Sequence, residues 1–305
     1  MFHSLKVAAL AALAGYPSLP LSAPERYSEL DAAIRNEREV SQNIRAQRIS
    51  EIYDQHFSRN NGAASVDSLP SAEVVALFRA ASDATAITRR PSDAKDMVKY
   101  VAGLEARGLA NLAQIQDTYG ALLETRLFRA ASEFYRLRGP LDWGEPVSLA
   151  TNSHRAITGH DLLTIPERGS ELGLSAVDLR GASQVMVIAH PQCGYTRRAA
   201  TDIEQDQTMR ALFGKRSTWV SAGGRFIGLG EFRKWNQRHP DLRMSIAYDP
   251  LQWADVEFWD SPTFLFYKDG QLVQRIVGWP KGGRLSELKA AARKAGLLKP
   301  PTTGQ

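Results

Sequence analysis

The stretch QVMVIAHPQCGYTRR, residues 184–198, carries the only cysteine of the chain at the end of a short apolar run. Residues 185–189 are mostly β-branched and are bounded by Gly181 and Pro191, which predicts a central strand covered on both faces. Polar residues with helical spacing follow, so Cys193 is expected at or next to a helix N-terminus. The sequence therefore places a thiol at a strand-to-helix junction.

This position favours a reactive cysteine. Unpaired backbone N–H groups at a helix start stabilise a thiolate, as do Arg197 and Arg198, and no acidic residue follows Cys193 before Asp202. The alternative is a buried cysteine that acts as a small apolar side chain. Exposure and thiol pKa distinguish the two interpretations.

Residues 189–197, AHPQCGYTR, resemble the active-site segment of the thioredoxin-fold thiol-disulfide oxidoreductases, whose motif is Cys-x-x-Cys. Here Thr196 stands in place of the second cysteine. Residues 261–273, SPTFLFYKDGQLV, resemble the cis-proline loop, strand, turn and strand of the same family. The resemblance covers about residues 181–298. The spacing of its two motifs leaves room for a βα insertion, as in the periplasmic membrane-tethered and cytochrome-maturation branches.

The resemblance implies a cis Ser261–Pro262 bond facing the cysteine across a substrate groove. It also implies the candidate site: the catalytic set is Cys193, Thr196 and Pro262, and the substrate-binding set is Ser261, His190 and Tyr195. Threonine cannot resolve a mixed disulfide, but its hydroxyl can donate a hydrogen bond to the thiolate. His190 has two possible roles, as an imidazolium that stabilises the thiolate or as a residue that shapes the turn.

These features lead to two functional hypotheses. The first is an exported redox protein that uses monothiol exchange with cysteine-containing proteins, the cycle being completed by an external thiol. The second is a redox-inactive thioredoxin-fold adaptor or chaperone-like binding protein, so the sequence leaves open whether the chain is an enzyme. No cofactor is expected, because one cysteine and no helically spaced histidine pair make a metal site within this chain improbable.

Length and composition indicate two domains. The chain has 305 residues, and its 43% hydrophobic and 23% charged residues are ordinary for a globular protein. The calculated pI is about 9.3. No basic run with interleaved aromatic residues accompanies it, so nucleic-acid binding is not expected.

Residues 1–23 resemble a signal peptide, in which Lys6 precedes the apolar residues 7–14. That apolar stretch is too short to span a bilayer, so no stable membrane span is expected after processing. The sequence therefore predicts a periplasmic or secreted protein whose mature form begins between about Gly15 and Glu25.

Residues 24–140 are predicted to form an all-α domain. Helices are expected at about 23–57, with a break near Val40, and at 72–84, 91–107, 109–120 and 121–137. The hexapeptide LFRAAS occurs at 77–82 and again at 127–132, which indicates either repeated helix pairs or chance.

Residues 141–305 are predicted to form an α/β thioredoxin-like domain. Further strands are expected at 162–165, 174–179, 217–220 and 242–248. Their alternation with helices predicts a central mixed sheet with helices on both faces.

Overall fold

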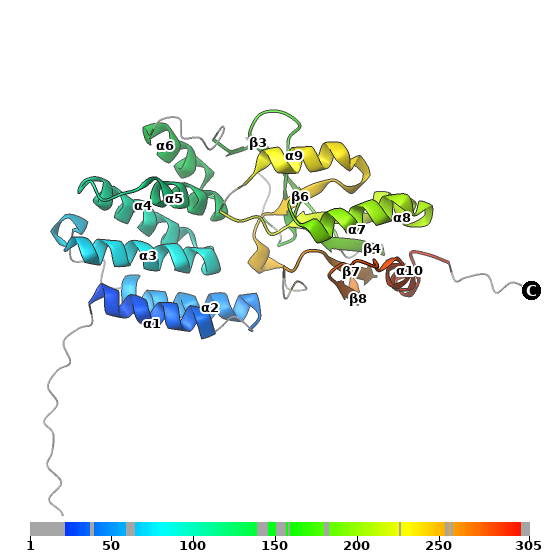
Figure 1. Ribbon diagram of the computed structural model, residues 1–305, viewed down its shortest axis with the longest axis horizontal. Helices are drawn as coiled ribbons and strands as arrows, with labels where there is room; N and C mark the ends of the chain where they lie inside the picture. Colours follow the sequence, from blue (N-terminus) through cyan, green and yellow to red (C-terminus); the bar gives the residue numbers. More distant parts are fainter. Residues whose placement is uncertain are drawn as a thin grey trace, which may run out of the picture.

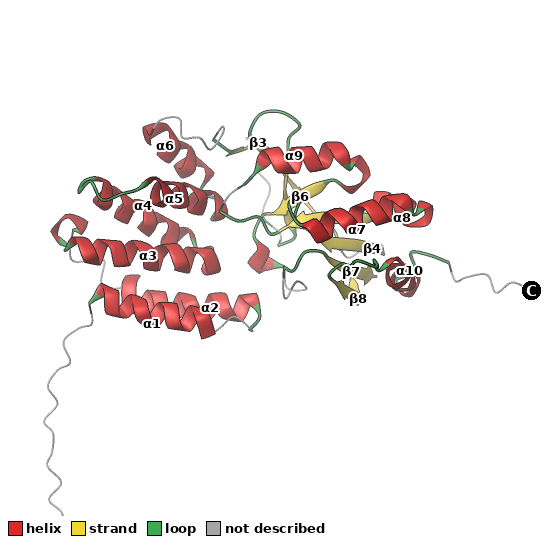
Figure 2. Cartoon of the chain, viewed as in Figure 1, coloured by secondary structure: helices red, strands yellow, loops and turns green. Residues whose placement is uncertain are grey.

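A computed structural model describes residues 22–36, 40–58, 65–138, 146–150, 157, 159–179, 183–225, 227–253, 256 and 259–299. An all-α region over residues 23–138 precedes an α/β region built on a mixed eight-stranded sheet (Figures 1 and 2). The fold class predicted from the sequence is confirmed at this level. The expected domain boundary at residue 140 and nearly all of the expected signal peptide lie outside the described residues; α1 begins at Ala23.

Over its described residues, the helical region is a stack of six α-helices (Figure 1). They are α1 (Ala23–Asn36), α2 (Gln42–Tyr53), α3 (Ser71–Thr88), α4 (Pro91–Glu105), α5 (Leu112–Glu124) and α6 (Phe128–Arg138). A π-helical turn, η1 (Asp54–Ser58), and a 3₁₀ turn, η3 (Val66–Ser68), lie between α2 and α3. Among the described residues, no helix is long and apolar enough to cross a membrane.

Local sequence explains where α4 and α5 begin. Pro91 begins α4, where its missing N–H costs nothing, and Asn111 and Gln114 form a capping box at the start of α5. Some predicted helix boundaries were wrong: α3 continues past residue 84 to Thr88, α5 continues past Gly120 to Glu124, and α6 begins at Phe128 rather than at residue 121. Gly120 lies within α5, where the absence of a side chain lets the backbone of Arg225 come close. A Cβ atom at this position would lie 2.6 Å from the carbonyl oxygen of Arg225.

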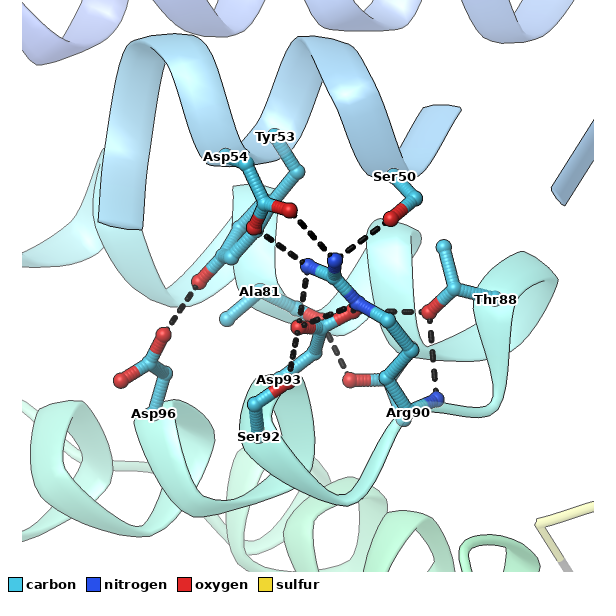
Figure 3. A network of polar contacts seen from close by, with 10 residues as sticks. Ser50, Tyr53, Asp54, Ala81, Thr88, Arg90, Ser92, Asp93 and Asp96 are labelled. Carbon is cyan, nitrogen blue, oxygen red and sulfur yellow. Dashed lines mark hydrogen bonds and ion pairs between the residues drawn. The ribbon is translucent and has the colours of Figure 1, made fainter. Parts of the chain in front are cut away.

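A polar network centred on Arg90 ties α2, α3 and α4 together (Figure 3). The guanidinium of Arg90 donates to Asp54 at 2.6 and 2.7 Å and to Asp93 at 2.8 Å. Asp93 is fully buried and also accepts a 2.7 Å hydrogen bond from the hydroxyl of Thr88. A buried carboxylate is tolerated here because charged and hydroxyl donors surround it.

The sheet has the order β1-β3-β2-β6-β5-β4-β7-β8. The strands are β1 (Ser148–Leu149), β2 (Asp161–Thr164), β3 (Glu171–Ala176), β4 (Gln184–Ile188), β5 (Ser217–Ser221), β6 (Met244–Ala247), β7 (Thr263–Lys268) and β8 (Gln271–Val277). Strands β4, β5 and β6 are parallel to one another, whereas β7 runs antiparallel to β4 and β8. The carboxyl ends of β4, β5 and β6 therefore share one edge of the sheet.

The described part of this region has four α-helices: α7 (Gly194–Gln205), α8 (Gln207–Arg216), α9 (Leu229–Arg238) and α10 (Leu285–Lys294). Their buried side chains share a core with Val185 and Val187 of β4. The alternating residues Met186 and Ile188 instead belong to a second core with Trp253, which follows the 3₁₀ turn η5 (Pro250–Gln252). No described residue of this second core belongs to an α-helix, so the helices do not cover the two faces of the sheet as evenly as expected. Non-helical residues such as Val256 complete the second core instead.

Two arginines of the helical region donate hydrogen bonds to the α/β region. Arg126, which follows α5, donates to the carbonyl oxygens of Ala247 at 2.7 Å and Tyr248 at 2.6 Å, at the end of β6. Arg89, which follows α3, donates to the carbonyl oxygen of Ala222, directly after β5, at 3.1 Å. Both contacts lie at the carboxyl edge of the parallel strands, so the helical region is docked at the edge to which β4 delivers Cys193.

A third arginine makes a contact in the opposite direction, from the α/β region to the helical region. Arg225, in the loop after β5, contacts Ser82 of α3, and Asp117 and Glu124 of α5. Glu124 is only 5% exposed and pairs with Arg89 at 3.4 Å and with Arg225 at 3.5 Å. Burial raises the pKa of Glu124, and the neighbouring arginines partly oppose that rise.

Candidate functional site

Strand β4 delivers Cys193 to the start of α7, as the sequence predicts. The turn after the strand is closed by the Cys193 amide, which donates to the carbonyl oxygen of His190 at 3.0 Å. Cys193 is the N-cap of α7 and has an extended backbone, with φ −71° and ψ 120°. Cys193 is neither fully buried nor fully exposed.

The sulfur lies against the loop that precedes β7. The Sγ atom of Cys193 donates to the carbonyl oxygen of Ser261 at 3.3 Å, and the Ser261–Pro262 peptide is cis. The expectation of a cis Ser261–Pro262 bond beside Cys193 is confirmed. Pro262 is buried, and its carbonyl oxygen accepts a 2.7 Å hydrogen bond from the amide of Gly278, which anchors the loop to the end of β8.

Thr196 lies beneath the thiol in the first turn of α7. Its side chain is fully buried, and its Oγ1 atom is 2.8 Å from the Oγ atom of Ser261. A buried hydroxyl requires a partner, and here the partner comes from the proline loop. The structure therefore brings together Cys193, Thr196, Ser261 and Pro262 of the predicted site.

The surroundings of Cys193 favour the thiolate. Partial burial alone raises the pKa of the Cys193 thiol, but hydrogen bonds from the backbone and hydroxyl of Thr196, the backbone of Tyr195 and the hydroxyl of Ser261 outweigh it. The net effect is a pKa below the ordinary thiol value. Hydrogen bonds to the thiolate therefore affect the pKa of Cys193 more than its partial burial does.

His190 shapes the turn. Its Nδ1 atom accepts a 3.3 Å hydrogen bond from the amide of Gln192, and its ring lies edge-on to Phe232 at 6.1 Å. Burial lowers the pKa of His190, which favours the neutral imidazole. Of the two roles that the sequence left open, this geometry supports the turn-shaping one.

Tyr195 lies on the exposed rim of the site. It is 55% exposed, and the guanidinium of Arg198 lies 4.7 Å from its ring centroid. Arg197 donates to the carbonyl oxygen of Gln192 at 3.0 Å and so braces the turn before the cysteine. The surface next to the thiol is therefore aromatic and cationic.

Comparisons of the chain with protein-family models, with curated proteins and with solved structures find no match. Over the ranges that the structure describes, no group of three or more His, Cys, Asp or Glu side chains is placed to hold a metal ion.

Sequence reasoning did not foresee several contacts that support this site. Trp279 donates from Nε1 to Asp202 at 2.7 Å, which fixes α7 against the segment after β8. Arg89, Arg126 and Arg225 were not singled out from the sequence, although they fasten the helical region to the carboxyl edge of the sheet. An arginine immediately after a helix gives no sequence signal that its side chain joins two regions.

Proposed function

We propose that this chain is a thioredoxin-like redox protein in which Cys193 forms mixed disulfides with cysteine-containing polypeptides by a monothiol route. The observation that carries the proposal is the position of the Cys193 sulfur, at the N-cap of α7 and 3.3 Å from the carbonyl oxygen of Ser261. Further support comes from the parallel β4–α7–α8–β5 unit beside the antiparallel pair β7 and β8.

The chemistry is thiol-disulfide exchange. The Cys193 thiolate attacks one sulfur of a partner disulfide; a new S–S bond forms as the partner bond breaks, and the second partner sulfur leaves as a thiolate and takes a proton from solvent. Thr196 cannot attack the new disulfide. An external thiol must therefore do so, and it becomes oxidised in a disulfide with the partner sulfur while Cys193 is released.

The test uses oxidised glutathione as the disulfide probe. Native protein should gain one glutathione, measured by intact mass, and Cys193→Ser should gain none. Thr196→Cys supplies a resolving thiol, so this variant should release the glutathione and retain an internal disulfide. Wild-type protein that stays unmodified, while the urea-unfolded chain is modified normally, would contradict the redox proposal.

The second candidate is a redox-inactive adaptor that binds polypeptides without covalent chemistry. The observation in its favour is that the resolving position holds Thr196. This side chain has no thiol and is fully buried, and its hydroxyl oxygen lies 2.8 Å from that of Ser261. Iodoacetamide labelling separates the two. A native Cys193 that reacts at pH 6 no faster than an ordinary thiol supports the adaptor.

We further propose export to the periplasm or the exterior, on the basis of Lys6 and the apolar residues 7–14. N-terminal sequencing of protein isolated from its native host tests this. A start between Gly15 and Glu25 is expected, whereas cytosolic protein that begins at Met1 would exclude export.

A further inference from the structure

A groove of about 650 Å³ crosses the helical region. Its lining comes from alternate helices, with Tyr27 on α1, Phe78 and Asp83 on α3, and Ala113 on α5. These three helices lie one above another in the stack (Figure 1). A groove that crosses three helices suits an extended chain better than a compact small molecule.

The groove also reaches the α/β region, because Arg225 is one of its lining residues. Arg225 lies in the loop after β5, and β5 is the parallel neighbour of β4, with Val220 opposite Ile188. The loop after β5 and Cys193 therefore emerge at the same edge of the sheet. Arg225 also contacts Ser82 and Glu124, so the groove reaches the contact between the two regions.

The charges around Asp83 favour a cation in the groove. Asp83 accepts a 2.8 Å hydrogen bond from the hydroxyl of Tyr27. Burial raises its pKa, and the nearby carboxylates of Asp31 and Asp117 add to that rise. The hydrogen bond from Tyr27 and the charge of Arg225 oppose this rise, but Arg225 is shared with Asp117 and Glu124. An added positive charge beside Asp83 would relieve this repulsion.

The other cation of the groove does not cancel this preference. Arg79 lines the groove but is exposed, so solvent screens its charge. Asp83 and Asp117 are partly buried, so their charges are screened less.

We propose that this groove binds an extended polypeptide segment of a partner protein, with a basic side chain seated beside Asp83. The inference goes beyond the proposed thiol chemistry and does not require Cys193 to react. If both hold, the groove places the partner beside the edge of the sheet that carries Cys193.

The test uses reduced, carboxamidomethylated lysozyme as a basic, unfolded probe that has no thiol left to react. Fluorescence anisotropy with the full chain should show saturable binding of this probe, weaker binding of carboxamidomethylated α-lactalbumin, which is acidic, and no binding of folded lysozyme. Equal binding of folded and unfolded lysozyme would mean general electrostatic attraction and would overturn the proposal.

Two variants localise the binding. Ala113→Trp fills the groove from an exposed helix position and should weaken binding about tenfold, whereas Leu137→Trp, on an exposed position of α6, should leave it unchanged. Asp83→Asn keeps an acceptor for Tyr27 but removes the charge, and should weaken binding of the basic probe about fivefold.

Unchanged binding in Ala113→Trp would exclude this groove. Iodoacetamide labelling of Cys193 in the same variants should match wild type. Failure of the groove proposal is thereby distinguished from failure of the thiol proposal.

Discussion

The hydroxyl oxygens of Thr196 and Ser261 lie 2.8 Å apart beside the Cys193 sulfur. The pair joins the first turn of α7 to the loop before β7, and both hydroxyls favour the thiolate form of Cys193. The residue that replaces the expected second cysteine is therefore part of the environment of the first. In the proposed thiol exchange, Thr196 cannot resolve a mixed disulfide, whereas its hydroxyl favours the thiolate of Cys193.

Replacing Thr196 by valine should weaken this effect. Valine keeps the shape of the side chain but loses the hydroxyl, so the pKa of Cys193 should rise and the thiolate fraction at pH 6 should fall. A hydrogen bond worth about 1 kcal/mol corresponds to iodoacetamide labelling about fivefold slower at that pH. Thr201→Val, on the exposed face of α7, is the control and should label like wild type.

His190 should make stability depend on pH in a defined direction. Burial lowers its pKa in the folded state, whereas the unfolded chain titrates near pH 6.5. As the pH falls through that value, the unfolded state binds a proton that the folded state does not, so stability is lost. Urea unfolding of wild type and His190→Gln at pH 7.5 and 5.5 tests this. The wild type should lose more stability on acidification than the variant, and equal losses would refute the assignment.

Arg126 should be important for the contact between the two regions. It has a left-handed backbone, with φ 62°, a conformation that favours glycine, yet its side chain makes the docking hydrogen bonds. Arg126→Ala should lower the free energy of unfolding by about 2 to 3 kcal/mol, because hydrogen bonds from a charged donor are lost. Arg126→Gly should cost about 1 kcal/mol less, since glycine adopts this conformation without strain.

The control for Arg126 is Arg129→Ala. The Arg129 side chain is 95% exposed, so its loss should change stability by less than about 0.5 kcal/mol. Denaturant unfolding measures all three variants. An Arg126→Ala protein as stable as Arg129→Ala would show that the docking contacts contribute little.

Gly120 provides a steric test of the same contact. A methyl group there would meet the backbone of Arg225 at 2.6 Å, so Gly120→Ala should push the loop away and cost about 1 to 3 kcal/mol. The matched substitution Gly230→Ala, in α9, meets no atom within 4 Å and should be neutral or stabilising by up to about 1 kcal/mol. Thermal unfolding that ranks the two variants in the opposite order would contradict the close approach.

The elements around the site were predictable because their signals are local. The β-branched run of residues 185–189 has the composition of a buried strand, and the polar residues after Cys193 have helical spacing. The break between α1 and α2 was also predicted near its observed place. The end of α5 was misplaced, because Gly120 was interpreted as a helix terminator although it accommodates a distant backbone.

The sequence by itself determined that a single thiol follows a strand, starts a helix and has threonine three residues later. Those features depend on near neighbours and already limit the chemistry to one cysteine. Only the tertiary structure decided which groups surround that thiol. Ser261, 68 residues away, reaches Cys193 because β4 and β7 pair in the sheet, and Arg126 reaches β6 because the two regions dock. Such contacts arise from packing over the whole chain, which local propensity does not encode.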